Sequence, residues 1–148
     1  EAMKRHGEAP QVHLCKRPAQ MTTSIADAIA AFNTSDHQSL AIIAKTQKQA
    51  AKLHKALVEA GCEARLLDGE SAGFSTGAIV CTAHLAKGLE FDRVIVADVS
   101  ASNYTTDMDR NLLYVACTRA MHRLALFAVG EASAWLPTPD DLNLNVPL

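Results

Sequence analysis

Residues that could do chemistry are concentrated in two short segments of this 148-residue chain. His84, Lys87 and Glu90 directly follow an apolar, strand-like run at Ala78–Thr82, and Arg119 closes a helical pattern further along. Charged residues in turns at strand ends are where open α/β sheets place ligands. Because a desolvated charge without a partner is costly, such groups indicate an anionic ligand or partner.

Several familiar chemistries are excluded by missing motifs. The chain contains no G-x-S-x-G nucleophile elbow, no G-x-G-x-x-G dinucleotide fingerprint and no G-x-x-x-x-G-K-[ST] phosphate loop. The six histidines are scattered and form no metal-ligand spacing with the cysteines, so we expect no metal site.

Each candidate residue also has a purely structural interpretation. His84 could be a hydrogen-bonded structural histidine, and Lys87 could be a solvated loop charge. Glu90 could pair with Arg93 or Arg119. Taken singly, none of these residues identifies a function.

The elements that must position these residues alternate between strand and helix. Such alternation, with continuous apolar strands, predicts a mainly parallel sheet between helices, a three-layer α/β domain. We expect strands at Gln11–Cys15, Leu40–Ala44, Glu63–Leu67, Ala78–Thr82, Val94–Val99 and Arg123–Val129, and helices at Met21–Asn33, Gln47–Ala60 and Asp107–Thr118.

Local signals predict how these helices begin and end. One of Thr22, Thr23 and Ser24 is expected to cap the first helix, and Gly61 to end the second. Either Thr106 or Asp107 is expected to cap the third.

Lysines recur at three- and four-residue spacing around the second helix, at Lys45, Lys48, Lys52 and Lys55. Such a stripe is ordinarily a solvated helix face. A phosphate backbone along it is the alternative, and binding would then depend on salt.

Composition limits the remaining classes. A net charge of −2 predicts no general affinity for nucleic acid, so any anion binding must be local. The four isolated cysteines, Cys15, Cys62, Cys81 and Cys117, indicate reduced structural thiols and a cytoplasmic protein. No apolar run is long enough to span a membrane. The start at Glu-Ala-Met suggests a piece of a longer protein.

Two segments resemble motifs of the UvrD/Rep-like superfamily 1 DNA helicases. Thr82-Ala-His-Leu-Ala-Lys-Gly-Leu-Glu-Phe-Asp92 resembles motif V, written T-x-H-x-x-K-G-L-E-F, and Leu113-Tyr-Val-Ala-Cys-Thr-Arg-Ala120 resembles motif VI, written Y-V-A-x-T-R-A. The run Ala41-Ile-Ile-Ala-Lys-Thr46 is similar to the family's strand before a helix.

The resemblance implies a RecA-like (P-loop NTPase-type) second motor domain over residues 11–136, after a flexible leading segment at 1–10 and before a Pro-containing tail at 137–148. It implies that ATP with Mg²⁺ lies between this domain and a first motor domain of the same polypeptide, which holds the metal ion. Arg119 would be the arginine finger that approaches the γ-phosphate.

The same resemblance assigns the remaining residues. Glu90 would contact the nucleotide ribose, Gly88 would allow close backbone approach, and Lys87 would give electrostatic support. Thr82 and His84 would contact the backbone of single-stranded DNA.

The chain also departs from the family pattern. The P-loop and the acidic motif are absent, so we expect no ATP hydrolysis by this fragment alone. Only Asp68–Gly77 stands where UvrD and Rep members carry a large helical insertion. That brevity resembles the helicase IV-like or RecD-like branch, which includes relatives that act on RNA polymerase.

Two functions are therefore open. The first is the C-terminal motor domain of an ATP-dependent 3′–5′ DNA helicase or translocase, acting on single-stranded or duplex DNA in processes such as repair. The second is an ATP-driven remodelling or interaction module that acts on RNA polymerase or a repair complex with little unwinding. A third alternative is a degenerate α/β domain without a nucleotide role.

Overall fold

The computed structural model describes residues 10–68 and 76–134 of the chain. Within them the element order is β1 (Gln11–Cys15), α1 (Pro18–Asn33), β2 (Ser39–Ala44), α2 (Gln47–Glu59), β3 (Arg65–Leu66), β4 (Gly77–Thr82), α3 (Ala83–Ala86), β5 (Phe91–Val96), α4 (Asp107–Cys117) and β6 (Ala120–Val129). The predictions for residues 1–9, for loop residues 69–75 and for residues 135–148 lie outside the described residues.

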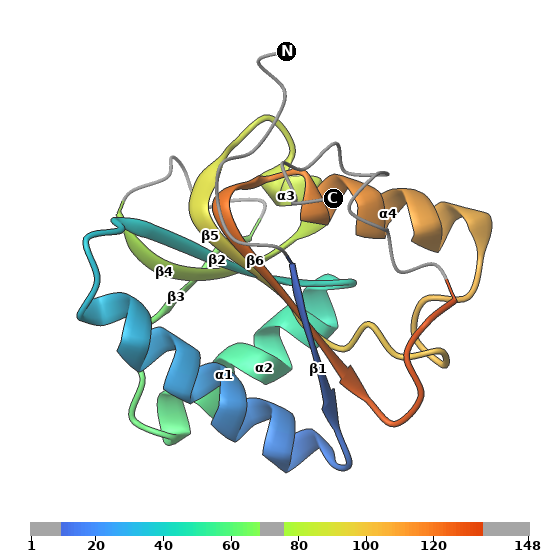
Figure 1. The fold of residues 1–148 in the computed structure, drawn as a ribbon, viewed down its shortest axis with the longest axis horizontal. Helices are drawn as coiled ribbons and strands as arrows, with labels where there is room; N and C mark the ends of the chain where they lie inside the picture. The colour runs from blue at the N-terminus through green and yellow to red at the C-terminus, as the bar shows by residue number, and fades with distance from the viewer. Residues whose placement is uncertain (1–9, 69–75, 135–148) are drawn as a thin grey trace, which may run out of the picture.

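Six strands form one parallel sheet in the order β1-β6-β5-β2-β4-β3 (Figure 1). Helices α1 and α2 pack on one face, where Ile25, Ile29 and Leu57 meet sheet residues such as Ile42. Helices α3 and α4 pack on the other face through residues such as Leu113. The predicted three-layer α/β architecture is therefore confirmed.

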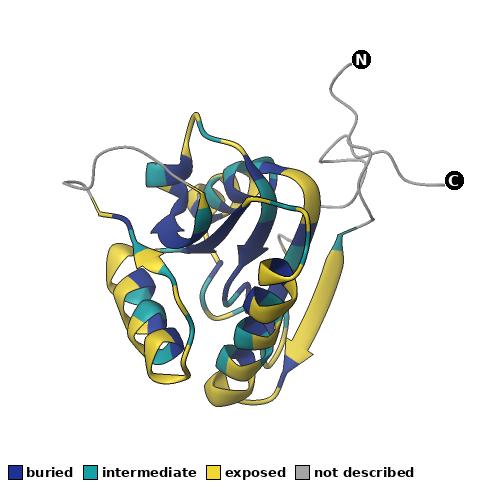
Figure 2. Cartoon of the chain, turned by 90° about the vertical axis from the view of Figure 1, so that its left-hand side faces the viewer, coloured by how far each residue is buried: buried dark blue, intermediate teal, exposed yellow. Residues whose placement is uncertain are grey.

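The sheet is covered in the middle and exposed at one edge. All six residues of β2 are buried, as its continuous apolar run predicts. Strand β1 lies at the sheet edge and is exposed at its first four residues, including Val12 and Leu14 (Figure 2). The central strands therefore hold the core, and β1 contributes little to it.

The expected cap of the first helix is wrong. Helix α1 begins at Pro18, after an extended Arg17 that makes no side-chain cap. Proline suits a first helical position because it lacks the amide hydrogen that would be unsatisfied there. The hydroxyl groups of Thr22 and Thr23 instead donate to the carbonyls of Pro18 and Ala19 within the helix.

The other two helix signals are confirmed. Gly61 follows α2 with φ of +94°, and its amide donates to the Val58 carbonyl. Thr106 caps α4 in a reciprocal capping box with Asp109.

Strand boundaries differ from prediction because pairing with neighbouring strands extends or shortens the elements. Strand β5 runs from Phe91 to Val96 rather than from Val94 to Val99, and β6 begins at Ala120 rather than at Arg123. Phe91 and Ala120 are register partners, so polar residues near both starts join the ladder. Strand β3 keeps only Arg65 and Leu66 of the predicted run.

Candidate functional site

The connection from β4 to β5 carries most of the predicted site residues and crosses one face of the sheet. Strand β4 ends at Thr82 on the carboxyl edge, beside the end of β2 at Ala44. Strand β5 begins at Phe91 on the opposite, amino edge. A six-residue strand spans roughly 20 Å, so the two ends of this connection lie at opposite edges of the sheet. Glu90 therefore lies away from the strand end at which Thr82 and His84 stand.

At the carboxyl edge, Thr82 and His84 lie together. Thr82 is buried, and its Oγ1 accepts a hydrogen bond from the Leu85 amide at 3.3 Å, which caps the short helix α3. His84 is exposed on that helix. Both residues line a cavity of about 470 Å³ together with Lys45 and Thr46. The arrangement offers a hydroxyl, an imidazole and a helix start to a ligand that crosses this edge.

The second helix contributes its amino end to the same cavity. Thr46 lines the cavity, and its Oγ1 accepts a hydrogen bond from the Gln49 amide at 3.1 Å. The first amide groups of a helix carry partial positive charge that favours anions. Thr46 and the start of α2 were not among the predicted site residues, although the strand-to-helix switch after Ala44 marks the position.

Lys45 has a role that the lysine stripe did not predict. Its Nζ donates to the Asn103 carbonyl at 2.6 Å and to Asp109 Oδ2 at 3.0 Å. Lys45 therefore fastens the end of β2 to the start of α4, while Lys48, Lys52 and Lys55 remain exposed on α2. The stripe interpretation is wrong for Lys45.

Asp109 is held in its charged form. Burial alone would raise its pKa, but hydrogen bonds from the amides of Thr105 and Thr106 and from Lys45 outweigh it. The pKa of Asp109 is lowered to about 2. At neutral pH an ion pair with Lys45 therefore fixes the helix that leads to Arg119.

Between the two edges, Lys87 ends α3 with an exposed side chain, and Gly88 adopts φ of +85°. Nothing would contact a Cβ at Gly88, so the backbone conformation is what requires glycine. Glu90 follows with an exposed side chain. Among the described residues it forms no ion pair with Arg93 or Arg119, so the structural interpretation of Glu90 is not supported.

At the amino edge, the segment around Glu90 is bonded to Arg119. The Phe91 amide donates to the Arg119 carbonyl at 2.9 Å, and Arg119 Nη1 donates to the Leu89 carbonyl at 3.2 Å. Arg119 Nη2 also donates to Thr118 Oγ1 at 3.2 Å. Motifs V and VI thus meet at this edge, and Glu90 lies between two residues bonded to Arg119.

The guanidinium of Arg119 has a hydrogen-bond donor that the described residues leave unused. Its Nε is buried and has no hydrogen-bond partner within the described parts of the chain. The acceptors of its Nη1 and Nη2 groups are a carbonyl and a hydroxyl, both neutral. A positive charge with neutral neighbours suits an anionic ligand that arrives from outside the domain.

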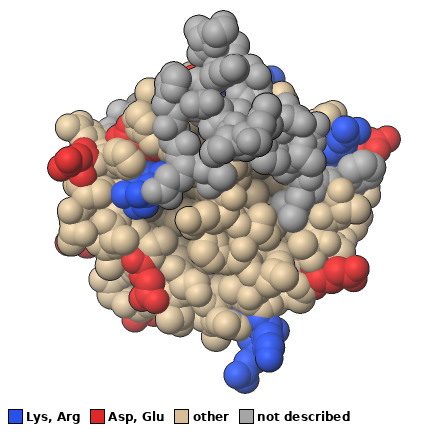
Figure 3. Space-filling view, in the orientation of Figure 1, with Lys and Arg blue, Asp and Glu red and all other residues tan. Residues whose placement is uncertain are grey.

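Other site classes find no support in the described residues. No cluster of three or more histidine, cysteine or acidic side chains there could hold a metal ion. None of the helices in ranges 10–68 and 76–134 has the length and apolarity needed to span a bilayer. All four cysteines are free thiols, and burial raises the pKa of Cys81 to about 12. The surface in Figure 3 mixes scattered acidic and basic side chains with a broad uncharged area.

Comparisons with known proteins identify relatives of this domain. Residues 77–127 match the UvrD-like helicase C-terminal domain family. F-box DNA helicase protein 1 of Schizosaccharomyces pombe is 40% identical over a 78-residue alignment, which covers 44% of this chain and 9% of that protein. The chain thus spans less than a tenth of that curated relative.

Solved structures extend the likeness to the whole domain. The C-terminal domain of a possible DNA helicase from Lactobacillus plantarum WCFS1 is 34% identical with a TM-score of 0.81, covering 94% of this chain and 85% of that one. The C-terminal domain of the DEAD-box protein Dbp5 shares the fold alone, at 17% identity and TM-score 0.56 over 82% of this chain and 77% of that one. Because a relative of 34% identity is matched over most of its length, this chain belongs to the UvrD-like helicase C-terminal domain family.

Proposed function

We propose that this chain is the second motor domain of an ATP-dependent 3′–5′ DNA helicase or translocase. It would complete an ATP site shared with a first motor domain of the same polypeptide. The observation that carries the proposal is the bonding of Arg119 to the segment around Glu90 at one sheet edge. Thr82 and His84 lie at the other edge on the same connection.

Arg119 is the proposed arginine finger. Its buried Nε has no partner among the described residues, and its hydrogen-bond acceptors are neutral. Both features fit a guanidinium that binds phosphate oxygens. A planar, permanently charged fork offsets the charge that develops on a transferred phosphoryl group. ATP with Mg²⁺ would supply the phosphoanhydride whose hydrolysis drives the motor, with Mg²⁺ held by the first domain.

Glu90, Gly88 and Lys87 are the proposed supports of the nucleotide. The exposed carboxylate of Glu90 can accept hydrogen bonds from ribose hydroxyl groups. Gly88, with φ of +85°, sets the chain direction that brings Glu90 to the amino edge. The exposed Lys87 adds positive charge to the same segment.

Thr82 and His84 are the proposed contacts to the backbone of single-stranded DNA. They share a cavity with Thr46 and the start of α2, which suits phosphate groups. One connection joins this cavity to Glu90 and Arg119. Closure of the two motor domains around ATP would therefore move Thr82 and His84 relative to the DNA strand. That linkage is the proposed basis of translocation.

The relatives support a role with DNA through their names, which describe DNA helicases. The short stretch between β3 and β4 favours the helicase IV-like or RecD-like branch, with a cytoplasmic location and repair as one process served. A remodelling module that acts on RNA polymerase or a repair complex is the second candidate, because that branch includes such relatives.

The test is ATP turnover by the full-length protein with single-stranded DNA present. Arg119→Ala should leave ATP binding largely intact and lower turnover by about a thousandfold or more, as the loss of an arginine finger does. Arg110→Ala, on the same helix α4, is the matched control and should be unchanged. Unchanged turnover in Arg119→Ala would refute the assignment of the finger.

Strand displacement separates the two candidates. A helicase should separate a duplex with a 3′ single-stranded tail at a rate that follows ATP turnover. A remodelling module should hydrolyse ATP without comparable strand separation. Residues 1–148 alone should hydrolyse no ATP, because the P-loop is absent from them.

A further inference from the structure

Helix α4 forms a second link between the two edges of the proposed motor site. Leu112 of α4 lines the same cavity of about 470 Å³ as Thr82 and His84, which we call the carboxyl-edge cavity. From Leu112 to the end of α4 at Cys117 the helix rises by roughly 8 Å, and Arg119 comes shortly after that end. One helix therefore borders the proposed DNA contacts and leads directly to the proposed arginine finger.

The start of α4 is fastened to the end of β2. Asp109, in the first turn of α4, is buried, and its Oδ2 accepts hydrogen bonds from the amides of Thr105 and Thr106 at 2.9 and 3.1 Å. The same oxygen accepts a hydrogen bond from Lys45 Nζ at 3.0 Å. Because separating such a pair would leave a buried charge without a partner, the pair holds its two elements in one arrangement. The first turn of α4 therefore follows the position of Lys45.

Lys45 lines the carboxyl-edge cavity and keeps one hydrogen-bond donor free. An ammonium group has three donors. Two of them bond to Asp109 and to the Asn103 carbonyl, the latter at 2.6 Å, and the third has no acceptor among the described residues. Nζ also lies 5.8 Å from the ring centroid of Tyr104, at the outer limit of a cation–π contact. The side chain is 22% exposed, so a phosphate group in the cavity can accept the remaining hydrogen bond.

Asn103 and Gln49 hold the surroundings of Lys45 together. Their side-chain amides exchange two hydrogen bonds, from Gln49 Nε2 to Asn103 Oδ1 at 2.9 Å and from Asn103 Nδ2 to Gln49 Oε1 at 3.2 Å. Asn103 Nδ2 also donates to the Asp98 carbonyl at 2.9 Å. We call Lys45, Gln49, Asn103 and Asp109 the Lys45 cluster. Because it ties the starts of α2 and α4 to the ends of β2 and β5, a shift of Lys45 is passed on to α4.

The other end of α4 is bonded to Arg119. The Arg119 amide donates to the Ala116 carbonyl at 3.2 Å, and Thr118 Oγ1 donates to the Val115 carbonyl at 2.8 Å. Arg119 Nη2 donates to that same Thr118 hydroxyl. The backbone and the guanidinium of Arg119 are thus both attached to the last turn of α4. A displacement of α4 therefore moves the proposed finger.

We propose that Lys45 is a positioning residue that couples DNA binding to ATP hydrolysis. A phosphate of the bound strand accepts the free hydrogen bond of Lys45 Nζ, and the Lys45 cluster carries the resulting shift through α4 to Arg119. The inference rests on the proposed function, because it needs DNA in the carboxyl-edge cavity and Arg119 at ATP. It adds a second route to the connection through Gly88, and it uses residues outside the two motifs that identified the family.

The test is the stimulation of the full-length protein by DNA, measured as the ratio of ATP turnover with saturating single-stranded DNA to turnover without it. Lys45→Met and Asp109→Asn should each lower this ratio by about fivefold or more, which is the size of ordinary coupling between sites. The double variant should lose no more than either single variant, because all three break one link. Lys45→Arg keeps the charge that pairs with Asp109 and should retain most of the stimulation.

A binding measurement checks the same coupling without catalysis. Coupling between two binding sites is reciprocal, so a non-hydrolysable ATP analogue should change the affinity of the parent protein for single-stranded DNA. Fluorescence anisotropy measures the dissociation constant with and without the analogue. Lys45→Met should bring the ratio of these two constants close to one. A variant that is merely less stable should keep the parent ratio.

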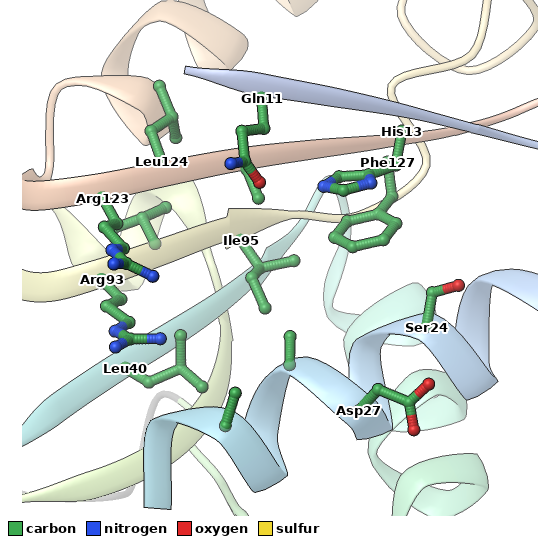
Figure 4. Close-up of a pocket in the computed structure, with 14 residues that line it drawn as sticks. Gln11, His13, Ser24, Asp27, Leu40, Arg93, Ile95, Arg123, Leu124 and Phe127 are labelled. Carbon is green, nitrogen blue, oxygen red and sulfur yellow. The ribbon is translucent and has the colours of Figure 1, made fainter. Parts of the chain in front are cut away.

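Three controls separate coupling from a loss of charge or stability. Lys48→Met removes an exposed lysine of α2. Asp27→Asn makes the same chemical change as Asp109→Asn on the other face of the sheet, where Figure 4 shows Asp27 on α1 beside a separate cavity. Gly61→Ala strains a left-handed glycine and controls for reduced stability. All three should keep the stimulation of the parent protein.

The outcomes distinguish failure of this inference from failure of the proposed function. If Lys45→Met and Asp109→Asn are stimulated by DNA as the parent is, the inference is wrong and the proposed function stands. If Gly61→Ala loses as much stimulation as they do, the role of Lys45 is structural and the inference is again wrong. If DNA does not stimulate the parent protein, the inference fails together with the proposed function.

Discussion

Arg119 Nη1 donates a hydrogen bond to the carbonyl oxygen of Leu89 at 3.2 Å, although thirty positions separate the two residues in sequence. The bond joins the end of helix α4 to the segment that precedes β5. Arg119 is thereby held next to Glu90 before any partner domain is present. Its position is therefore a property of this domain, whereas its proposed catalytic role needs another.

The first prediction separates the structural from the catalytic role of Arg119. Arg119→Met in residues 1–148 should change the free energy of unfolding by only about 1 kcal/mol, because the lost hydrogen bonds are offset by removal of a buried, unpartnered Nε. Urea denaturation measures this change. The same variant in the full-length protein should nearly abolish ATP turnover. A loss of stability several times larger would mean that Arg119 chiefly holds the fold together.

The second prediction concerns Gly88. Gly88→Ala forces a side chain into a left-handed conformation and should cost about 1 kcal/mol of stability. Gly61→Ala is a matched control, since Gly61 also has positive φ and open space around it. Both variants should lose similar stability by thermal denaturation, but only Gly88→Ala should lower ATP turnover of the full-length protein. Equal turnover in the two would remove Gly88 from the nucleotide site.

The third prediction concerns the proposed DNA contacts. His84 is exposed, so His84→Ala should weaken single-stranded DNA binding by the full-length protein without changing stability. Thr82→Val should weaken binding and also cost about 1 kcal/mol, because it removes the cap of α3. Fluorescence anisotropy at several salt concentrations measures the affinity and its salt slope. Lys55→Ala, on the exposed side of α2, is the control for a nonspecific loss of charge.

The fourth prediction concerns acid stability. The folded-state pKa of Asp109 is lowered from 3.8 to about 2, so its contribution is present above pH 4 and is lost as pH falls toward 2. Allowing for solvent screening near the surface, that contribution is on the order of 1 kcal/mol. Asp109→Asn should therefore be less stable than the parent chain at pH 6 and should approach it near pH 2. Urea denaturation across this pH range measures the difference, and a constant difference would contradict the ion-pair account.

The buried strands could be predicted well because their signal is local. The run Leu40–Ala44 has apolar residues on both faces, and every residue of β2 is buried in the centre of the sheet. The start of β5 could not be predicted in the same way. Asp92 and Arg93 look like loop residues, but the Asp92 amide bonds to Ser39 Oγ and Arg93 pairs in register with Arg123.

In the candidate site, too, local features could be predicted from the sequence and long-range contacts could not. The residue types and order of His84, Glu90 and Arg119 identified the family, which the comparisons support. The contribution of Lys45 was missed, because its partner Asp109 is 64 positions away and carries no local mark of the pairing.

The sequence by itself determined a parallel α/β domain and the motifs of a helicase motor. Apolar periodicity and motif spacing are properties of neighbouring residues, so they can be read along the chain. Tertiary structure alone decided that Thr82 and Glu90 lie at opposite edges of the sheet and that Arg119 donates a hydrogen bond to Leu89. Those relations depend on the direction in which each connection crosses the sheet and on which strands become neighbours. Both are set by packing between distant segments.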